Sequence, residues 1–323
     1  MSTAIFTGGD RIGGAASEVA GTGVVARRER RWGLGFVSPW LVGFLVFFTM
    51  PLVASLVLSF TDYELADQDG KPTGFVGLEN WRRLFSDPDV RQGAVVTFKY
   101  GLVAIPLSIL IPLGIAYLMV SKHLRFRGFF RAMFYLPTMV PFVAAAIVWR
   151  FYLNGEFGWF AKLFAQVGID VPDFGLNATM AMLSLLLIGT WGIGNAMIVD
   201  IAALNGVPRD LYEAAMLDGA GAWRQFRDVT FPMISPIVFY NLVLALVGLG
   251  QYFVVPYVLT DGSGKPDGAL SFYTMYFYKQ TFVLFQGGYG AALAWAMFIV
   301  IFGLTALLFR SARYWVHYEY EER

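Results

Sequence analysis

The chain has 323 residues, of which 57% are hydrophobic and only 15% are charged, and its net charge is +1. Soluble domains carry about 25% charged residues, so this composition excludes an ordinary soluble protein. The absence of cysteine excludes disulfides, iron–sulfur clusters and thiol nucleophiles. The two isolated histidines, His123 and His317, argue against a metal or proton-relay site built from histidine.

The first predicted segment is residues 1–33. It is rich in glycine, alanine, serine and threonine, lacks the apolar core of a secretory signal, and ends in four arginines between positions 27 and 31. Basic residues beside a membrane span are typical of its cytoplasmic side. We therefore expect a disordered, basic cytoplasmic tail over residues 1–33.

Six apolar segments follow, each near the roughly 20-residue length of a helix that crosses a bilayer. Prolines recur within them and predict kinked helices. Strands of a membrane β-barrel would be shorter and would alternate in polarity. The predicted fold class is thus an all-α membrane protein with six transmembrane helices, at residues 37–60, 94–120, 132–153, 179–200, 234–260 and 291–309.

The distribution of lysine and arginine predicts the orientation of these helices. Fifteen of them fall in the tail and in the segments 121–131, 201–233 and 310–323, and seven fall in the intervening loops. The positive-inside rule then places both termini in the cytoplasm. We expect residues 34–93 to hold the first transmembrane helix and an acidic outer loop, residues 94–310 the transmembrane core, and residues 311–323 a cytoplasmic tail.

A polar break at residues 208–232 separates the fourth and fifth predicted helices. Asp210 and Glu213 have the spacing of a capping box, so a short helix is expected over residues 211–217. Gly219 and Gly221 could take positive φ and end it. A second short helix is expected over residues 223–229, with Pro232 marking the entry into the fifth span.

This stretch resembles the EAA loop of binding-protein-dependent ABC importer permeases. In that pattern, EAA is followed by three residues, GA, and then a spaced phenylalanine, an apolar residue and Leu-Pro; Phe231 stands here where leucine is usual. Further stretches at 75–88, 136–141, 154–160 and 257–264 resemble the sugar, maltose-type branch, so the similarity covers most of residues 36–310. The matching positions of the loop are Glu213, Ala214, Ala215, Asp218, Gly219, Ala220, Phe226, Val229 and Pro232.

The resemblance implies the type I ABC importer permease architecture and a set of partners. A separate cytoplasmic ATPase, present in two copies, would dock on Glu213, Ala214, Ala215, Asp218, Gly219 and Ala220. A second, homologous permease would complete a heterodimer, and an extracytoplasmic solute-binding protein would deliver the solute. The expected location is the cytoplasmic membrane of a bacterium or archaeon.

No catalytic or cofactor-binding pattern accompanies the loop. The Walker A pattern is absent, because both Gly-Lys pairs, at Gly70 and Gly264, are followed by proline. ATP and Mg²⁺ are therefore expected on the partner ATPase, and this chain is expected to be a transport subunit, not an enzyme. No metal site and no nucleic-acid partner are predicted.

Polar and aromatic residues inside the predicted spans are candidates for the solute pathway, since polar groups are costly there. The alternative is that their amides bond between helices or that their rings pack. Two further groups are expected to be structural: Asp200 would pair with a basic group, and Arg150 would extend outward or contact Glu156. The pathway candidates are Trp191, Asn195, Gln251, Tyr252 and Trp295.

Three functions remain open at this point. The favoured one is an ATP-driven importer of a sugar or related polyol. A neutral sugar is favoured over a phosphorylated solute because no cluster of lysine or arginine lies inside the spans to hold a phosphate. The same importer class could carry glycerol-phosphate. A secondary transporter or a membrane-embedded enzyme would need intramembrane carboxylates or clustered histidines, and neither is prominent here.

Overall fold

The computed structural model describes residues 32–66, 73–121, 124–166, 168 and 177–317. The expected disordered tail lies almost wholly outside the described residues, as does the end of the expected C-terminal tail from residue 318 onward. The chain divides into two compact units, residues 1–57 and 58–323, which are described separately.

The described part of the first unit is the helical run Trp32–Leu58, whose last residue begins the second unit. It includes a π-helical turn, η1 (Leu45–Thr49), followed by α2 (Met50–Leu58). The π turn lies where the ring of Pro51 would otherwise meet the carbonyl of Phe47, so a wider turn relieves that contact. Phe47 is 84% exposed, as suits a helix whose apolar side chains face lipid.

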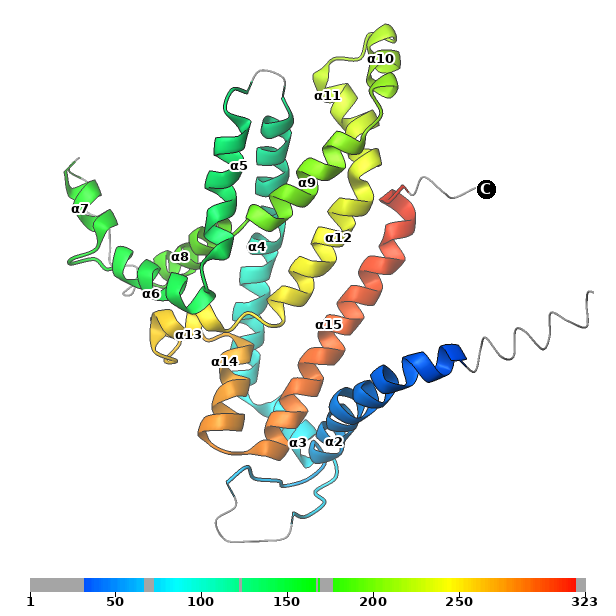
Figure 1. Cartoon of the computed structure of the whole chain (residues 1–323). Coiled ribbons are helices and arrows are strands. Elements are labelled where there is room, and N and C mark those ends of the chain that lie inside the picture. Colours follow the sequence, from blue (N-terminus) through cyan, green and yellow to red (C-terminus); the bar gives the residue numbers. More distant parts are fainter. Residues whose placement is uncertain (1–31, 67–72, 122–123, 167, 169–176, 318–323) are drawn as a thin grey trace, which may run out of the picture. The chain divides into compact units, whose positions relative to one another are not determined.

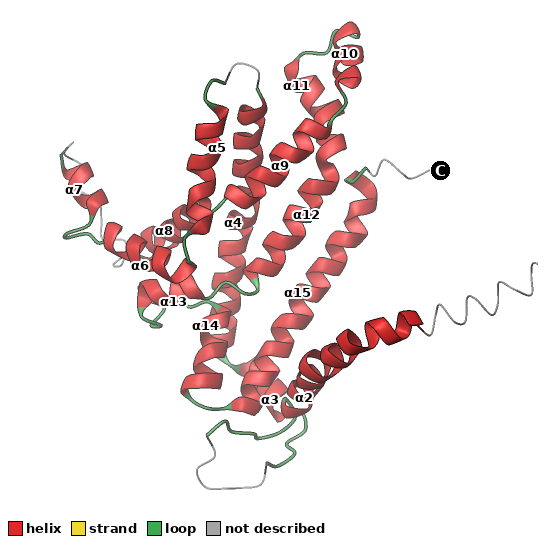
Figure 2. Ribbon diagram, in the orientation of Figure 1, coloured by secondary structure: helices red, strands yellow, loops and turns green. Residues whose placement is uncertain are grey.

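All described elements of the second unit are helices joined by loops, apart from an isolated bridge between Thr61 and Phe75 (Figure 2). They are α3 (Glu79–Ser86), α4 (Pro88–Val120), α5 (Arg127–Tyr135), η2 (Leu136–Met139), α6 (Phe142–Tyr152), α7 (Trp159–Ala165), α8 (Ala178–Trp191), α9 (Gly194–Gly206), α10 (Arg209–Leu217), α11 (Ala222–Gln225), η3 (Phe226–Thr230), α12 (Phe231–Leu249), α13 (Val254–Thr260), α14 (Tyr273–Tyr278), η4 (Lys279–Val283) and α15 (Gly287–Trp315).

Among the described residues, four helical runs are long and apolar enough to cross a membrane, and two bent pairs bring the number to six if each pair is one span. The unbroken runs are Trp32–Leu58, Pro88–Val120, Ala222–Leu249 and Gly287–Trp315. The bent pairs are Arg127–Met139 with Phe142–Tyr152, at 101°, and Ala178–Trp191 with Gly194–Gly206, at 49°. The prediction of an all-α protein is confirmed, but two of the expected spans are broken.

The sharpest break lies inside the span expected at residues 132–153. Val140 adopts an extended conformation and Pro141 caps the start of α6. The ring of a proline disfavours helical geometry in the preceding residue, and proline itself lacks the N–H that a continuing helix needs. The fifth expected span is also shorter than 234–260, because α12 ends at Leu249 and residues 254–260 form the separate helix α13.

The helix α4 is the centre of the second unit, and it contacts α8, α9, α12 and α14. Leu113 and Ala116 of α4, Met197 of α9 and Ile234 of α12 belong to one buried apolar cluster. Ala116 and Met197 are completely buried, so these three helices are packed closely along that part of their length. Figure 1 shows α10 and α11 beyond the ends of α9 and α12, at the same end of this unit as the C-terminal end of α15.

The predicted partner of Arg150 is wrong. Its guanidinium does not contact Glu156; it donates two hydrogen bonds of 2.6 Å to Asp261, which follows α13, and one of 3.2 Å to the carbonyl of Val258. The hydrogen bonds from Arg150 hold the pKa of Asp261 below its ordinary value. This fork-shaped contact joins α6 to the C-terminal end of α13.

Candidate functional site

The EAA loop, residues 208–232, begins where α9 ends. Pro208 is the N-terminal cap of α10, and no side chain caps this end, so the predicted capping box does not form. Asp210 instead lies within the first turn of α10, where a negative charge is favoured by the helix dipole. Proline suits this place because its missing N–H is one that the first turn of a helix leaves free.

The end of α10 is closed by backbone hydrogen bonds around Gly219. The N–H of Ala220 donates to the carbonyl of Ala215 over 2.9 Å, and the N–H of Gly219 donates to that of Met216 over 3.0 Å. This pair of bonds is a Schellman motif, and it requires the positive φ of 75° that Gly219 adopts. The same expectation for Gly221 is wrong: its φ is −71°, and it caps the start of α11.

The second predicted helix of the loop does not stand alone. It merges with the fifth span into one helical run, Ala222–Leu249, with a π-helical turn at Phe226–Thr230. That turn lies just before Pro232, as η1 lies just before Pro51, and the wider turn again accommodates a proline without ending the helix. The second half of the loop therefore returns to the membrane as one continuous helix.

The base of the loop is anchored and its tip is exposed. The Tyr212 hydroxyl lies 2.8 Å from the hydroxyl of Thr230, and Thr230 is only 1% exposed. At the tip, Leu217 is 90% exposed and Trp223 is 73% exposed. An apolar side chain that touches so little of its own chain is available to a partner.

The six residues predicted to dock the ATPase lie together in α10 and in the turn that follows it. Four of them are exposed, Glu213, Ala214, Asp218 and Gly219, while Ala215 and Ala220 are half-buried.

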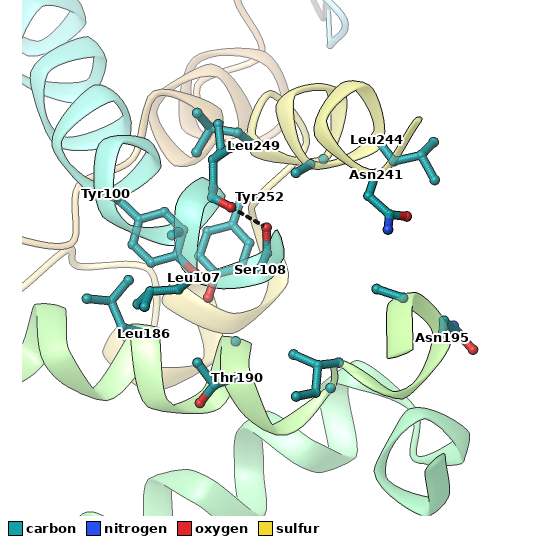
Figure 3. A pocket seen from close by; sticks show the side chains of 18 of the residues that line it. Tyr100, Leu107, Ser108, Leu186, Thr190, Asn195, Asn241, Leu244, Leu249 and Tyr252 are labelled. Atoms are coloured by element: carbon teal, nitrogen blue, oxygen red, sulfur yellow. Dashed lines mark hydrogen bonds between the residues drawn. The ribbon is translucent and has the colours of Figure 1, made fainter. Parts of the chain in front are cut away.

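A pocket of about 630 Å³ lies in the second unit between α4, α8 with α9, and α12 (Figure 3). Most of its lining residues are apolar, and Figure 3 shows Tyr100 and Tyr252 at one end and Asn195 and Asn241 at the other. Within the described part of the chain, no lysine or arginine lines it.

One end of the pocket is aromatic. The rings of Tyr100 and Tyr252 stack with centroids 4.8 Å apart, and Phe272 packs edge-on against Tyr252 at 5.3 Å. The Tyr252 hydroxyl is buried at this end of the pocket. Gly189 on α8 leaves room for the Tyr100 hydroxyl, since an added Cβ would lie 3.3 Å from it.

The other end of the pocket carries amides. Asn241 of α12 extends toward the side formed by α8 and α9, while the amide of Asn195 is turned away from the two tyrosines (Figure 3). The Asn241 Nδ2 donates to the carboxylate Oδ1 of Asp200 over 2.9 Å. Among the described residues Asp200 forms no ion pair with a basic group, so the predicted basic partner is replaced by this amide.

The sequence of the chain matches a known protein family and several known proteins. Residues 93–316 match the family described as the binding-protein-dependent transport system inner membrane component. The chain is 36% identical to a probable ABC transporter permease protein, YesP, of Bacillus subtilis (strain 168), over 92% of this chain and 95% of that protein. The chain belongs to this permease family.

Two further similarities agree. The lactose transport system permease protein LacF of Rhizobium radiobacter is 30% identical, over 86% of this chain and 93% of that protein. A bacterial alginate ABC transporter, crystallised in complex with an alginate pentasaccharide-bound periplasmic protein, contains a chain of the same fold. Its TM-score is 0.74 at 20% sequence identity, over 88% of this chain and 95% of that chain.

The permease is thus a multi-pass component of the cytoplasmic membrane, and it transports solute instead of catalysing a reaction. Membership of the family also implies an ATPase subunit and a solute-binding protein as its partners.

The structure brings two of the five predicted pathway residues into the pocket of the permease, Asn195 and Tyr252. Trp191 instead packs against Trp149 at 5.9 Å, Gln251 is exposed just after α12, and Trp295 on α15 packs against Phe298 at 5.3 Å.

Sequence reasoning left several lining residues out of the site. Tyr100, Ala104 and Ser108 recur every four residues along α4, which is the spacing of one helix face, so this pattern was available. Thr190 and Tyr240 are also polar lining residues outside the predicted set, and Asn241 is a polar lining residue within the fifth predicted span.

Proposed function

We propose that this permease imports a neutral sugar, most simply an oligosaccharide, through the pocket between α4, α8, α9 and α12. The observation that carries the proposal is the pocket's combination of stacked tyrosines at one end, amides at the other and no cationic residue among its described lining residues. Sugars present C–H faces that pack on aromatic rings and hydroxyls that bond to amides and phenols. The name of the lactose permease relative supports the same solute class.

A phosphorylated solute is less well supported. Phosphate groups are bound in proteins by arginine and lysine, by backbone N–H groups or by helix N-termini. The described residues that line the pocket include neither arginine nor lysine. Glycerol-phosphate therefore remains the weaker alternative, and an ion-driven mechanism is not favoured in a chain of this family.

We further propose how the transport is driven. The tip of the EAA loop, with Glu213 and Leu217, docks on a cytoplasmic ATPase subunit, and ATP and Mg²⁺ bind to that subunit. Two ATPase copies need two such loops, and this chain has one, so a second, homologous permease completes a heterodimer. An extracytoplasmic binding protein delivers the sugar to the end of the permease opposite the EAA loop.

The first experiment reconstitutes the permease in proteoliposomes with its partner permease, ATPase and binding protein. Uptake of radiolabelled maltose and lactose is compared with uptake of radiolabelled glycerol 3-phosphate. ATP-dependent uptake of a neutral sugar, together with stimulation of ATP hydrolysis by the loaded binding protein, is the expected result. Uptake of glycerol 3-phosphate alone would overturn the neutral-sugar proposal.

The coupling role of the loop is tested with a matched pair, Gly219→Asp and Gly221→Asp. Both positions are open to solvent, with no atom within 4 Å of an added Cβ, so the two variants differ mainly in backbone conformation. Gly219 needs positive φ, whereas Gly221 caps α11, where aspartate is favoured. Gly219→Asp is expected to assemble but lose the stimulation, and Gly221→Asp to keep it. Equal behaviour of the two would refute the docking proposal.

A further inference from the structure

A buried carboxylate–amide pair joins α9 to α12 within the membrane-spanning part of the permease. Asp200 is 2% exposed and Asn241 is 8% exposed. Their hydrogen bond of 2.9 Å links residues 41 positions apart in the sequence, so it is a contact between two separate helices.

The pair lies between the pocket and the packed core. On one side, Asn241 lines the pocket together with Val199, the neighbour of Asp200. On the other side, Met197, Ile201 and Val238 belong to the buried cluster shared with α4. Asp200 therefore does not line the pocket itself, but its only hydrogen-bond partner among the described residues does.

The carboxylate decides which end of the amide faces the pocket. An ionised carboxylate only accepts hydrogen bonds, so it selects the Nδ2 end of Asn241. The carbonyl Oδ1 of Asn241 and one N–H are then free to face the cavity. A neutral amide at position 200 would bond equally well to either end of Asn241 and would fix neither.

Stability alone does not account for this pair. The second carboxylate oxygen, Asp200 Oδ2, is buried and has no hydrogen-bond partner among the described residues. An unsatisfied buried polar atom costs about 1–3 kcal/mol, and more when it is charged. Apolar residues of similar size often stabilise such a place better than a buried charge does.

The two helices that carry the pair also carry the EAA loop. α9 leads through Val207 into α10, and α12 continues from η3 at the other end of the loop. The hydrogen bond between Tyr212 and Thr230 closes the base of the loop between them. The Asp200–Asn241 pair and the EAA loop are thus carried by the same two helices.

We propose that Asp200 is a positioning residue of the transport cycle: it holds the Asn241 amide with its carbonyl toward the pocket, as an acceptor for a solute hydroxyl. Because the pair joins both helices of the EAA loop, the amide moves with the loop. This inference rests on the proposed import of a neutral sugar.

The test compares wild type with Asp200→Asn in the reconstituted transporter, using the labelled maltose or lactose that the wild type accumulates. The variant keeps the shape of the side chain and can still accept the bond from Asn241, so the complex should assemble. Sugar transported per ATP hydrolysed is expected to fall at least fivefold. The exchange Asp200→Asn with Asn241→Asp restores a carboxylate–amide pair but turns the carboxylate to the pocket, so it should assemble without restoring transport.

The matched control is Thr97→Val, which removes another buried hydrogen bond between helices. Thr97 on α4 accepts from the N–H of Tyr273 at the start of α14, and neither helix carries the EAA loop. The control should transport as the wild type does. If Asp200→Asn stays within twofold of the wild-type ratio, or fails to assemble, the positioning role is overturned. If the wild type itself accumulates neither sugar, the proposed function fails instead.

Discussion

A hydrogen bond between the hydroxyls of Tyr212 in α10 and Thr230 in η3 links the two sides of the EAA loop at its base. Tyr212→Phe should cost about 1 kcal/mol, because it removes one hydrogen bond while leaving the ring in place. We expect faster hydrogen exchange in α10 and a weaker stimulation of ATP hydrolysis. Hydrogen-exchange mass spectrometry of the purified complex measures the first effect directly.

Tyr117→Phe is the control for that change. The ring of Tyr117 packs edge-on against Phe226 of the same region at 5.7 Å, but its hydroxyl has no hydrogen-bond partner among the described residues. The control should leave the exchange rates of α10 unchanged. Identical exchange in both variants would mean that the hydroxyl of Tyr212 does not stabilise the loop.

Asp87 lies between α3 and α4 and joins α4 to α14 and α15 through hydrogen bonds. Its Oδ2 accepts hydrogen bonds from the hydroxyls of Tyr276 and Tyr289, at 2.5 Å and 2.7 Å, and its Oδ1 accepts from the N–H of Asp89 at the start of α4. Burial alone would raise the pKa of Asp87. The hydrogen bonds outweigh it and leave the pKa below its ordinary value.

The lowered pKa gives the stability of the permease an acid dependence. The contribution of Asp87 is complete above the unfolded pKa of about 3.9 and is lost as the pH falls through the lower folded value. Asp87→Asn should therefore cost about 1 kcal/mol at pH 7, where the carboxylate is ionised. Melting temperatures of the detergent-solubilised proteins should differ at pH 7 and converge toward pH 3. A difference that stays constant with pH would contradict the assignment.

The helices of this permease depend on where glycine and proline fall within them. Proline bends the chain at Pro141 but is absorbed by π-helical turns ahead of Pro51 and Pro232. Glycine acts differently at Gly194, the first residue of α9. An added Cβ there would lie 2.7 Å from the carbonyl oxygen of Phe134 and 2.8 Å from the Cα of Tyr135. α5 and α9 can approach this closely only because position 194 has no side chain.

Gly194→Ala should force α5 and α9 apart and destabilise the permease by about 2 kcal/mol, as overpacking of a close contact does. Gly206→Ala, at the other end of α9, is the matched control, since an added Cβ meets nothing within 4 Å there. Thermal unfolding in detergent should show a lower melting temperature for the first variant only. Equal melting temperatures would show that the contact can relax without cost.

The whole molecule makes a prediction about its orientation. The excess of lysine and arginine on one set of segments predicts that α10 lies in the cytoplasm and α3 outside. The chain contains no cysteine, so single cysteines can be introduced without background. Leu217 is 90% exposed and Phe85 is 84% exposed, so Leu217→Cys and Phe85→Cys are sites that a reagent can reach.

A membrane-impermeant maleimide should label Phe85→Cys in intact cells whose outer envelope admits it, and Leu217→Cys only in inside-out vesicles. The permease is expressed without its ATPase for this measurement, so that no docked partner shields position 217. The reverse pattern would place both termini on the outer side and would exclude docking of a cytoplasmic ATPase on α10.

Local patterns in the sequence determined the class of this protein, its apolar helices and its EAA loop. Each of these depends on a window of about 20 residues or fewer, within which hydropathy, the positive φ of Gly219 and the place of Pro208 act directly. The loop pattern also identified the family before any contact was known. The predicted capping box failed because Pro208 caps the helix two residues earlier than Asp210 would have done.

Only the tertiary structure decided which polar residues meet. Successive side chains on a helix point about 100° apart, so a polar residue in a span faces a neighbour that depends on the rotation and crossing of two helices. Asp200 therefore pairs with Asn241, where a basic group was expected, and Arg150 pairs with Asp261 and not with Glu156. Helix packing also brings three residues to one pocket: Tyr100 of α4, Asn241 of α12 and Tyr252, which follows the end of α12. No local pattern encodes that meeting, because it arises from contacts between segments more than a hundred residues apart.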